Sequence, residues 1–207
     1  MNAREEWLVQ RRAGLGGSDI GAILGLSPYR TPVDVWMEKT GRGTGQDETL
    51  QMRFGSYAEE FVAREYTAKT GNSVQRFTPM LHHPVAPVLG NVDRLVIPSG
   101  AKVASHKQEI RTDRGLECKT ASAFSVNDDQ NWGEEGTDQV PPSYLIQCST
   151  YMALTGCSLW DLAVLFGNQE LRIYNLKRDA ELEQEIVARS TEWWNRHIVG
   201  DVAPEPV

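Results

Sequence analysis

A long amphipathic helix is the feature of this sequence that most constrains its fold. From Asp47 to Thr70, apolar residues recur at steps of three and four, and Gly71 follows directly. Such residues share one face of a helix, which must be covered by another layer of the protein. A glycine after the last periodic residue is a typical helix end. The apolar positions are Leu50, Phe54, Tyr57, Ala58, Phe61, Val62 and Tyr66.

The segments on either side of this helix predict a mixed architecture. Short β-branched segments with turn markers between them predict an antiparallel meander of strands at 73–77, 80–82, 88–97, 103–105 and 115–120. Further strands are expected at 159–166 and 170–175, and further helices at 5–12, 19–24, 32–39, 143–154 and 179–197. Ser18 and Thr31 are the predicted N-caps of the second and third helices. This order predicts an α/β (mixed α+β) fold in one domain, 1–207.

Composition excludes several classes of protein. The chain has 207 residues, 40% of them hydrophobic, which is enough for one substantial core. Its three cysteines form no C-x-x-C spacing, so neither a disulfide framework nor a zinc site is indicated. We find no apolar leader and no segment long enough to span a bilayer, and we therefore expect a cytoplasmic protein.

The net charge of −7 is unevenly distributed along the chain. Residues 1–120 carry a net charge of +2, whereas residues 121–207 carry −9. A polyanion could therefore be bound by the N-terminal part, if its basic residues share a face. Segment 121–142 is polar and has no periodicity, which in a compact domain indicates either a functional loop or a disordered one.

Three residues of the predicted strands point to chemistry. In the strand 115–120, Glu117 and Lys119 lie on one face because side chains alternate along a strand, and Asp93 lies in the strand predicted at 88–97. Two carboxylates and a lysine from adjacent strands suit a divalent metal that activates water for phosphodiester hydrolysis. The pattern D-x23-E-x-K is weak by itself, because a solvated strand face with a cross-strand ion pair would give the same residues.

Four segments in order, one of which contains Asp93, Glu117 and Lys119, give the chain a family resemblance. It resembles the phage-type recombination exonucleases, the lambda exonuclease or alkaline exonuclease family of the PD-(D/E)xK nuclease superfamily. The matching residues are Trp7 to Ile20 with Ile23 to Gly25, Ser27 to Tyr29 and Trp36 to Gly41; Phe54 to Glu60 and Tyr66 to Gly71; Val92-Asp93 and Leu116 to Lys119; and Tyr144 to Gln147 with Tyr151 to Gly156. The resemblance implies a restriction-endonuclease-like core over about 47–200, preceded by a helical DNA-end region over about 1–46.

The resemblance also assigns catalytic roles. Asp93, Glu117 and the main-chain carbonyl of Cys118 match metal ligands, and Lys119 matches the residue that positions or activates water. Gln147 matches a glutamine behind the active-site strands, although the family often has Q-x-Q where this chain has Gln-Cys-Ser. The family also has a glutamate on the long helix.

That helix glutamate has two candidates in this chain. Glu59 matches when Gly55 and Gly71 are used as anchors. Glu65 remains the alternative, because it lies nearest the centre of the apolar face on a helical wheel.

Arg11 and Ser18 match family residues that bind the 5′-phosphate of a DNA end. Arginine supplies a bidentate fork, and a serine at a helix N-terminus favours an anion. The alternatives are an N-cap for Ser18 and a solvated helix end for Arg11. Arg30, Arg42 and Arg53 are further candidate phosphate contacts of the N-terminal part.

The function implied is a metal-dependent 5′-to-3′ exonuclease. It would degrade one strand of linear duplex DNA to mononucleotides and leave 3′ single strands for recombination by annealing. The resemblance further implies Mg²⁺, two ions per active site with Mn²⁺ also suitable, a homotrimeric ring around DNA and a single-strand annealing protein as partner. Two alternatives stay open: a DNA endonuclease of the same superfamily, and a noncatalytic DNA-end-binding protein.

Overall fold

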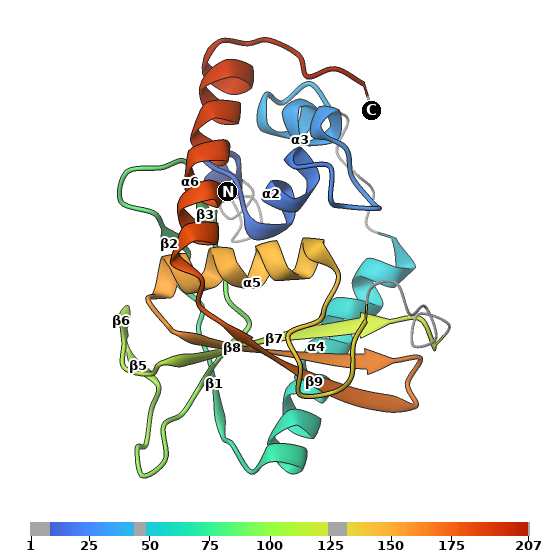
Figure 1. Ribbon diagram of the computed structural model, residues 1–207, viewed down its shortest axis with the longest axis vertical. Coiled ribbons are helices and arrows are strands. Elements are labelled where there is room, and N and C mark those ends of the chain that lie inside the picture. Colours follow the sequence, from blue (N-terminus) through green and yellow to red (C-terminus); the bar gives the residue numbers. More distant parts are fainter. Residues whose placement is uncertain (1–8, 44–48, 124–131, 207) are drawn as a thin grey trace.

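A five-stranded sheet forms the centre of the protein. The computed structural model describes residues 9–43, 49–123 and 132–206 (Figure 1). The strand order is β1-β4-β7-β8-β9, formed by β1 (Val74–Arg76), β4 (Arg94–Val96), β7 (Arg114–Ala121), β8 (Leu159–Phe166) and β9 (Glu170–Lys177). The predicted mixed α/β fold, with a mixed central sheet flanked by helices, is confirmed.

One pairing of the sheet is parallel, and it lies outside the antiparallel meander predicted for 73–120. β7 and β8 are parallel, whereas the other neighbours are antiparallel. Parallel strands need a crossover connection, which here includes helix α5 (Pro142–Thr155). The crossover therefore places α5 against one face of the sheet.

Two helices cover the two faces of the sheet. Side chains alternate along β8, so Trp160, Leu162 and Val164 pack with the α5 residues Cys148, Tyr151 and Met152. The opposite face packs against helix α4 (Leu50–Thr70), whose Val62, Ala63 and Tyr66 meet Leu116 and Cys118 of β7. As predicted, Gly71 ends α4 in the left-handed conformation, with φ of 75°.

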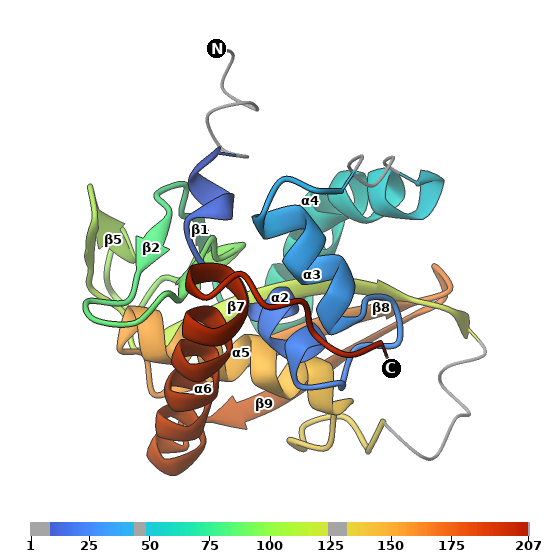
Figure 2. The same ribbon diagram turned by 90° about the horizontal axis from the view of Figure 1, so that it is seen from above.

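A third layer lies on the far side of α5 (Figures 1 and 2). It contains α2 (Gly17–Ile23), α3 (Pro32–Lys39) and α6 (Ala180–Trp193), the last continuing as a π-helical segment, η2 (Trp194–Val199). Leu15, Ile20, Val35, Ile146 and Ile186 form the buried cluster between these helices and α5. In the part of the chain that is described, no helix is both long and apolar enough to span a membrane.

Several boundaries differ from the prediction. The strand predicted at 88–97 is two pieces, β3 (Leu89–Gly90) and β4, and Asp93 lies in the bend just before β4. β3 pairs with β2 (Leu81–His82), and β5 (Ser105–His106) pairs with β6 (Glu109–Ile110), which was not predicted. Residues 9–12 of the predicted first helix are helical, and its start lies outside the described residues. The polar segment 121–142 is described only in part, and its Trp132 packs against the core.

Ser18 is not the N-cap of α2. The cap is Gly16, whose N–H donates to the carboxylate of Asp19, and Ser18 lies one residue inside the helix with its side chain exposed. Thr31 caps α3 as predicted, accepting from the Asp34 N–H.

The single apolar face predicted for α4 is wrong. Ala58, Val62, Ala63 and Tyr66 are buried, but four large apolar side chains of the same pattern are exposed to solvent: Leu50 (74%), Phe54 (50%), Tyr57 (86%) and Phe61 (53%). Their spacing of four, three and four residues forms a second stripe, which we call the outer α4 stripe. The helix therefore has an apolar face that the sheet does not cover.

Gly17 sets how closely α2 approaches α5. A Cβ atom at Gly17 would lie 2.9 Å from Cγ and 3.0 Å from Cα of Gln147. This close contact places Ser18 and the residues around it beside Gln147.

We expect Gly17→Ala to destabilise the protein by about 1–3 kcal/mol, since the added methyl group must push two packed helices apart. Gly55→Ala is the matched control. Its methyl group would come no closer than 3.9 Å to Thr120, and alanine should stabilise α4 by up to about 1 kcal/mol. Urea unfolding measures both, and a Gly17→Ala protein as stable as wild type would contradict the close packing.

Candidate active site

Glu117 and Lys119 lie on the α5 face of β7, as strand alternation predicts. The Lys119 Nζ is 2.7 Å from Glu117 Oε1. The same oxygen accepts a hydrogen bond of 2.7 Å from Gln147 Nε2, which also donates to the Tyr151 hydroxyl at 2.9 Å. Glu117 is only 2% exposed. Lys119 and Gln147 therefore fix the orientation of a buried carboxylate, as the predicted grouping requires.

Asp93 approaches Glu117 and Lys119 from the edge of β7 that pairs with β4. β4 pairs with Gly115 and Leu116, and beyond that point the Cys118 N–H donates to Asp93 Oδ2 at 2.9 Å. The N–H and C=O groups of one strand residue point to the same edge. The carbonyl of Cys118 therefore faces Asp93, consistent with the ligand role predicted for it. Burial raises the pKa of the Cys118 thiol, and its side chain packs in the core rather than at the site.

The charges at this site are incompletely balanced. Burial and the neighbouring Glu117 carboxylate raise the pKa of Asp93 well above its usual value, although Lys119 opposes this. Burial alone would lower the pKa of Lys119, but Glu117 and Asp93 raise it above its usual value. Lys119 is therefore protonated at neutral pH, and one ammonium group faces two carboxylates.

Glu59 is held close to Asp93 by a residue that the sequence analysis did not identify. Arg94 is 4% exposed and forms ion pairs with Glu59 and, at 2.9 Å, with Glu60. The guanidinium also donates to the main-chain oxygen of Asp93 at 2.7 Å. Glu65, the alternative helix carboxylate, is exposed. The structure thus brings Glu59, not Glu65, towards the site.

The donors present fit a hard divalent cation. Asp93 and Glu117 offer carboxylate oxygens, and Glu117 Oε2 is buried without a hydrogen-bond partner among the described residues. A cation here would satisfy that oxygen and relieve the repulsion between the carboxylates. In the described part of the chain, no group of three or more His, Cys, Asp or Glu side chains is close enough to hold a metal. Any metal here would therefore also need main-chain or external oxygen ligands.

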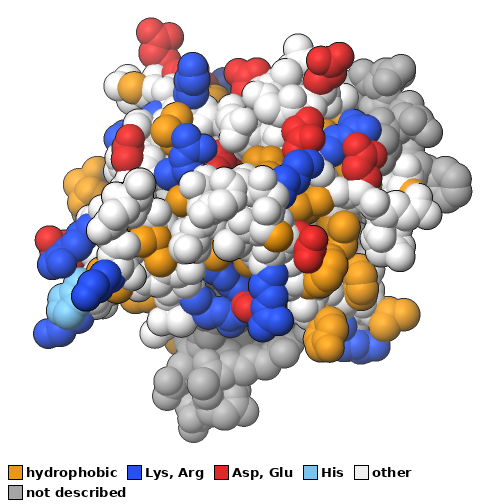
Figure 3. All heavy atoms as spheres, turned by 90° about the horizontal axis from the view of Figure 1, so that it is seen from below, with side chains coloured by type: hydrophobic (Ala, Val, Ile, Leu, Met, Phe, Trp, Pro, Cys, Tyr) orange, Lys and Arg blue, Asp and Glu red, His pale blue; other side chains and the backbone are white. Residues whose placement is uncertain are grey.

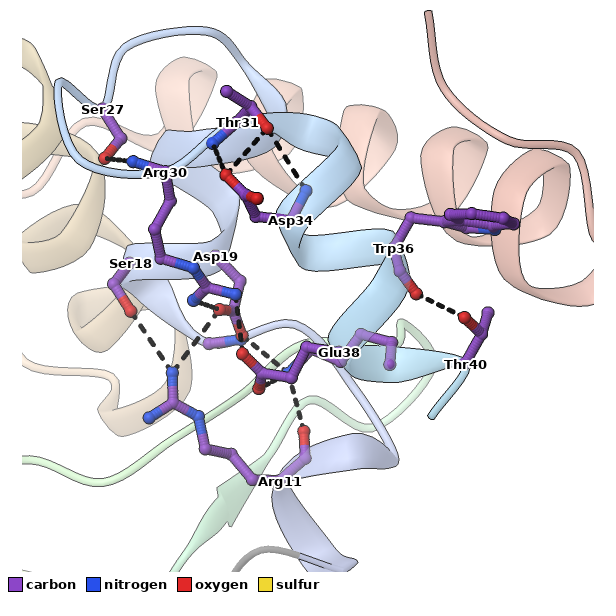
Figure 4. A network of polar contacts seen from close by, with 12 residues as sticks. Arg11, Ser18, Asp19, Ser27, Arg30, Thr31, Asp34, Trp36, Glu38 and Thr40 are labelled. Carbon is purple, nitrogen blue, oxygen red and sulfur yellow. Dashed lines mark hydrogen bonds and ion pairs between the residues drawn. The ribbon is translucent and has the colours of Figure 1, made fainter. Parts of the chain in front are cut away.

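A second polar cluster surrounds Asp19 on α2 (Figure 4). Asp19 has no exposed surface and pairs with Lys39 at 2.7 Å, Arg30 at 2.6 Å and Arg11 at 3.4 Å. Arg11 also lies 3.5 Å from the Ser18 hydroxyl. The two predicted phosphate-binding residues, Arg11 and Ser18, are therefore neighbours.

One cavity connects the two clusters. It has a volume of about 520 Å³, and its lining includes Ser18 and Arg30 of the N-terminal layer together with Lys119 and Gln147. Tyr144 also lines it, with the Lys119 ammonium 5.8 Å from the centre of its ring. A ligand in this cavity can therefore contact both clusters at once.

Sequence reasoning missed some members of both clusters. Asp19, Lys39, Arg94 and Tyr151 lie within the matched segments or next to them, but no local pattern distinguishes them from surface residues. Arg30 was one of three candidate arginines, and the structure singles it out by its contact with Asp19. Buried ion pairs between distant segments produce no periodic signal, so only the fold reveals them.

The fold is that of known exonucleases. The chain superposes on the exonuclease LHK-Exo in complex with dAMP with a TM-score of 0.71 and 18% identity, covering 95% of this chain and 93% of the other. The alkaline exonuclease LHK-Exo from Laribacter hongkongensis gives 0.69 at 17% identity, with the same coverage. A phage-related exonuclease from Haemophilus somnus 129PT gives 0.60 at 11% identity, covering 95% and 100%. At these identities the likeness shows the fold alone.

Sequence comparison shows the family to which the chain belongs. Residues 6–158 match the YqaJ-like viral recombinase domain, and the chain belongs to that family. It is 34% identical over 206 residues to the uncharacterized protein YqaJ of Bacillus subtilis (strain 168), covering 98% of this chain but 59% of that protein. The chain thus spans well under two thirds of the relative's length. The resemblance to phage-type recombination exonucleases is confirmed in family and fold.

The raised pKa of Asp93 predicts that this carboxylate destabilises the metal-free protein. The unfolded chain loses the Asp93 proton at a lower pH than the folded chain, so stability falls as pH rises above about 4. Metal-free Asp93→Asn should therefore be more stable than wild type at pH 8, and the difference should vanish below about pH 4. Added Mg²⁺ should stabilise wild type more than the variant. Chemical denaturation with chelator and with Mg²⁺ measures both effects.

Asp161→Asn is the control with the opposite sign. Asp161 is also buried, but Arg114, Tyr66 and Asn175 all donate to its carboxylate. Removing that charge should destabilise the protein. Asp93→Asn protein that is less stable than wild type at pH 8 would contradict the unbalanced charge at the site.

Proposed function

We propose that this protein is a metal-dependent 5′-to-3′ exonuclease that degrades one strand of linear double-stranded DNA to mononucleotides. The observation that carries the proposal is the cavity lined by Ser18 and Arg30 together with Lys119, which pairs with the buried Glu117. Such a cavity suits a substrate with one phosphate at a chain end and another at the bond to be cleaved. The family, a viral recombinase domain, supports a role in recombination through the 3′ single strands left behind.

Asp93, Glu117 and the Cys118 carbonyl would hold Mg²⁺, which when bound polarises the scissile phosphate and acidifies water. A second ion would need further ligands, for which Glu59 is the nearby candidate, and Mn²⁺ suits the same oxygen donors. Lys119 would orient the attacking water with its ammonium group. Gln147 would keep Glu117 in the orientation needed to bind the ion.

Arg11 and Ser18, together with Arg30, would bind the terminal 5′-phosphate. Guanidinium groups bind phosphate oxygens through paired hydrogen bonds. The supporting contacts are the 3.5 Å approach of Arg11 to the Ser18 hydroxyl and the position of Arg30 at the cavity wall. Binding the end phosphate would set the direction of digestion.

The protein would act on DNA ends in the cytoplasm of a bacterial or phage-infected cell. A single-strand annealing protein would then bind the 3′ strands that the reaction leaves. An endonuclease of the same superfamily remains the second candidate, and closed circular DNA distinguishes the two. A noncatalytic end-binding protein would release no nucleotides.

The deciding experiment uses linear duplex DNA labelled differently at its 5′ and 3′ ends, with Mg²⁺ or with chelator. We expect mononucleotides from the 5′ label first, no products with chelator, and intact closed circles. Lys119→Ala should lower the rate by about 100- to 1,000-fold, as loss of one positioned, charged hydrogen-bond donor at a reacting centre does. Cleavage of closed circles, or full activity of Lys119→Ala, would contradict the proposal.

We also propose that the protein forms a homotrimeric ring around DNA. The supporting observation is the outer α4 stripe, a contiguous apolar surface of the kind that subunit contacts cover. Figure 3 views the molecule from the side on which α4 lies, and hydrophobic side chains gather there next to basic ones. A ring would keep the enzyme on DNA by topology, which suits a chain with a net charge of −7.

Tyr57→Lys combined with Phe61→Lys should convert a trimer into monomers, because each subunit contact would then bury unpaired charges. Val85→Lys is the control, since Val85 is 86% exposed and lies in the loop between β2 and β3 rather than on α4. Light scattering coupled to size-exclusion chromatography measures the mass. A monomeric wild type, or a double variant that stays trimeric, would reject this interface.

A further inference from the structure

The carboxylate of Asp19 is the centre of a buried charge cluster beside the cavity (Figure 4). Its Oδ1 accepts from Arg30 Nη1 at 2.6 Å and from Arg11 Nη2 at 3.4 Å. Its Oδ2 lies 2.7 Å from Lys39 Nζ and accepts from the Gly16 N–H at 3.0 Å. One fully buried acid thus binds three cations from three separate segments of the chain.

Asp19 is ionised at every working pH. Burial would raise its pKa, but Lys39, Arg11 and Arg30 outweigh burial and lower the pKa to about 2. The acid therefore carries a permanent negative charge between two guanidinium groups, which would otherwise repel each other.

Lys39 fixes Arg11 at a second point. Its ammonium group has no exposed surface and donates to the main-chain oxygen of Arg11 at 2.8 Å. Asp19 and Lys39 together therefore hold both the side chain and the backbone of Arg11, although Arg11 is 28 residues away from Lys39 in the sequence.

The two arginines keep their guanidinium groups close to the cavity. Arg30 also pairs with Glu38 at 2.7 Å, a second contact that fixes its position. Arg30 and Ser18 line the cavity, and Arg11 lies next to Ser18. An anion at this wall would meet two arginines whose positions are already set, which lowers the cost of ordering them on binding.

We propose that Asp19 is a positioning residue that holds Arg11 and Arg30 for a terminal 5′-phosphate, and that discrimination between phosphorylated and unphosphorylated DNA ends depends on it. This inference rests on the proposed function. Lys39 keeps Asp19 ionised and holds the backbone of Arg11 in place. Asp19 itself repels phosphate and acts only through the two arginines.

A merely structural Asp19 would behave differently. It would stabilise the N-terminal layer, and its loss would affect phosphorylated and unphosphorylated ends alike. The informative readout is therefore the ratio of kcat/KM on 5′-phosphorylated linear duplex to that on the same duplex with a 5′-hydroxyl end.

We expect Asp19→Asn to lower this ratio by about ten- to a hundredfold, as loss of hydrogen bonds to charged groups does. The change should lie mainly in KM, because the end phosphate binds equally in the ground and transition states. Fluorescence anisotropy of the two duplexes with Ca²⁺ in place of Mg²⁺ should show the same loss in binding. This second readout needs no turnover.

Two further variants distinguish a loss of arginine positioning from a loss of stability. Asp19→Asn combined with Lys39→Met removes the buried acid and its buried cation together, so no unpaired ammonium group remains. This double variant should fold and still lose the preference for 5′-phosphorylated ends. Glu183→Gln is the matched control, because Glu183 is a buried acid paired with Arg178 at 2.9 Å on α6. It should lower stability in urea and leave the ratio at the wild-type value.

The outcomes separate the inference from the function on which it rests. Wild type that digests no linear DNA would reject the proposed function. Wild type that digests DNA from 5′ ends without preferring a phosphate would overturn the inference alone. So would an unchanged ratio in the folded Asp19 variants, or a ratio that falls equally in Glu183→Gln.

Discussion

The hydrogen bond from the Cys118 N–H to the Asp93 carboxylate is the contact around which the candidate active site is arranged. β4 pairs with Gly115 and Leu116, and at Cys118 an acid takes the position that a strand neighbour would occupy. The edge of β7 therefore carries both a carboxylate and a main-chain carbonyl at one point. Glu117 and Lys119 flank Cys118 on β7. Because side chains alternate between the faces of a strand, both lie on the same face.

Helix α5 connects this edge to the N-terminal layer. Gln147 donates to Glu117 on one side and lies against Gly17 on the other, where a Cβ atom would be only 2.9 Å away. The active-site strands and the Asp19 cluster are thus separated by one helix. Parallel pairing of β7 and β8 is what requires α5 to cross the sheet here.

The parts of the fold that sequence predicted are those with local causes. Helix α4 and its end at Gly71, the Thr31 cap of α3, and strand β7 each follow from periodicity or from one residue's conformational preference. Strand alternation correctly placed Glu117 and Lys119 on one face of β7. Asp93 was expected inside a strand but lies in the bend before β4, and its contact with Cys118 depends on the fold. The errors have non-local causes. The outer α4 stripe was predicted to be buried, because periodicity does not show which apolar face of a helix is covered by another layer of the protein. Asp19 and Arg94 are recognisable only through partners distant in sequence.

Asp19 and Asp93 show how one residue type serves two purposes. Both carboxylates are removed from water, but three cations lower the pKa of Asp19 to about 2, whereas burial and the neighbouring Glu117 raise the pKa of Asp93. The first charge is fully balanced by the protein, so it can only hold other groups in place. The second is left unbalanced beside a buried oxygen of Glu117 that has no partner among the described residues. An arrangement that lowers the stability of the metal-free chain can be stabilised by an external cation, and we therefore propose a metal-binding role for Asp93 and a positioning role for Asp19.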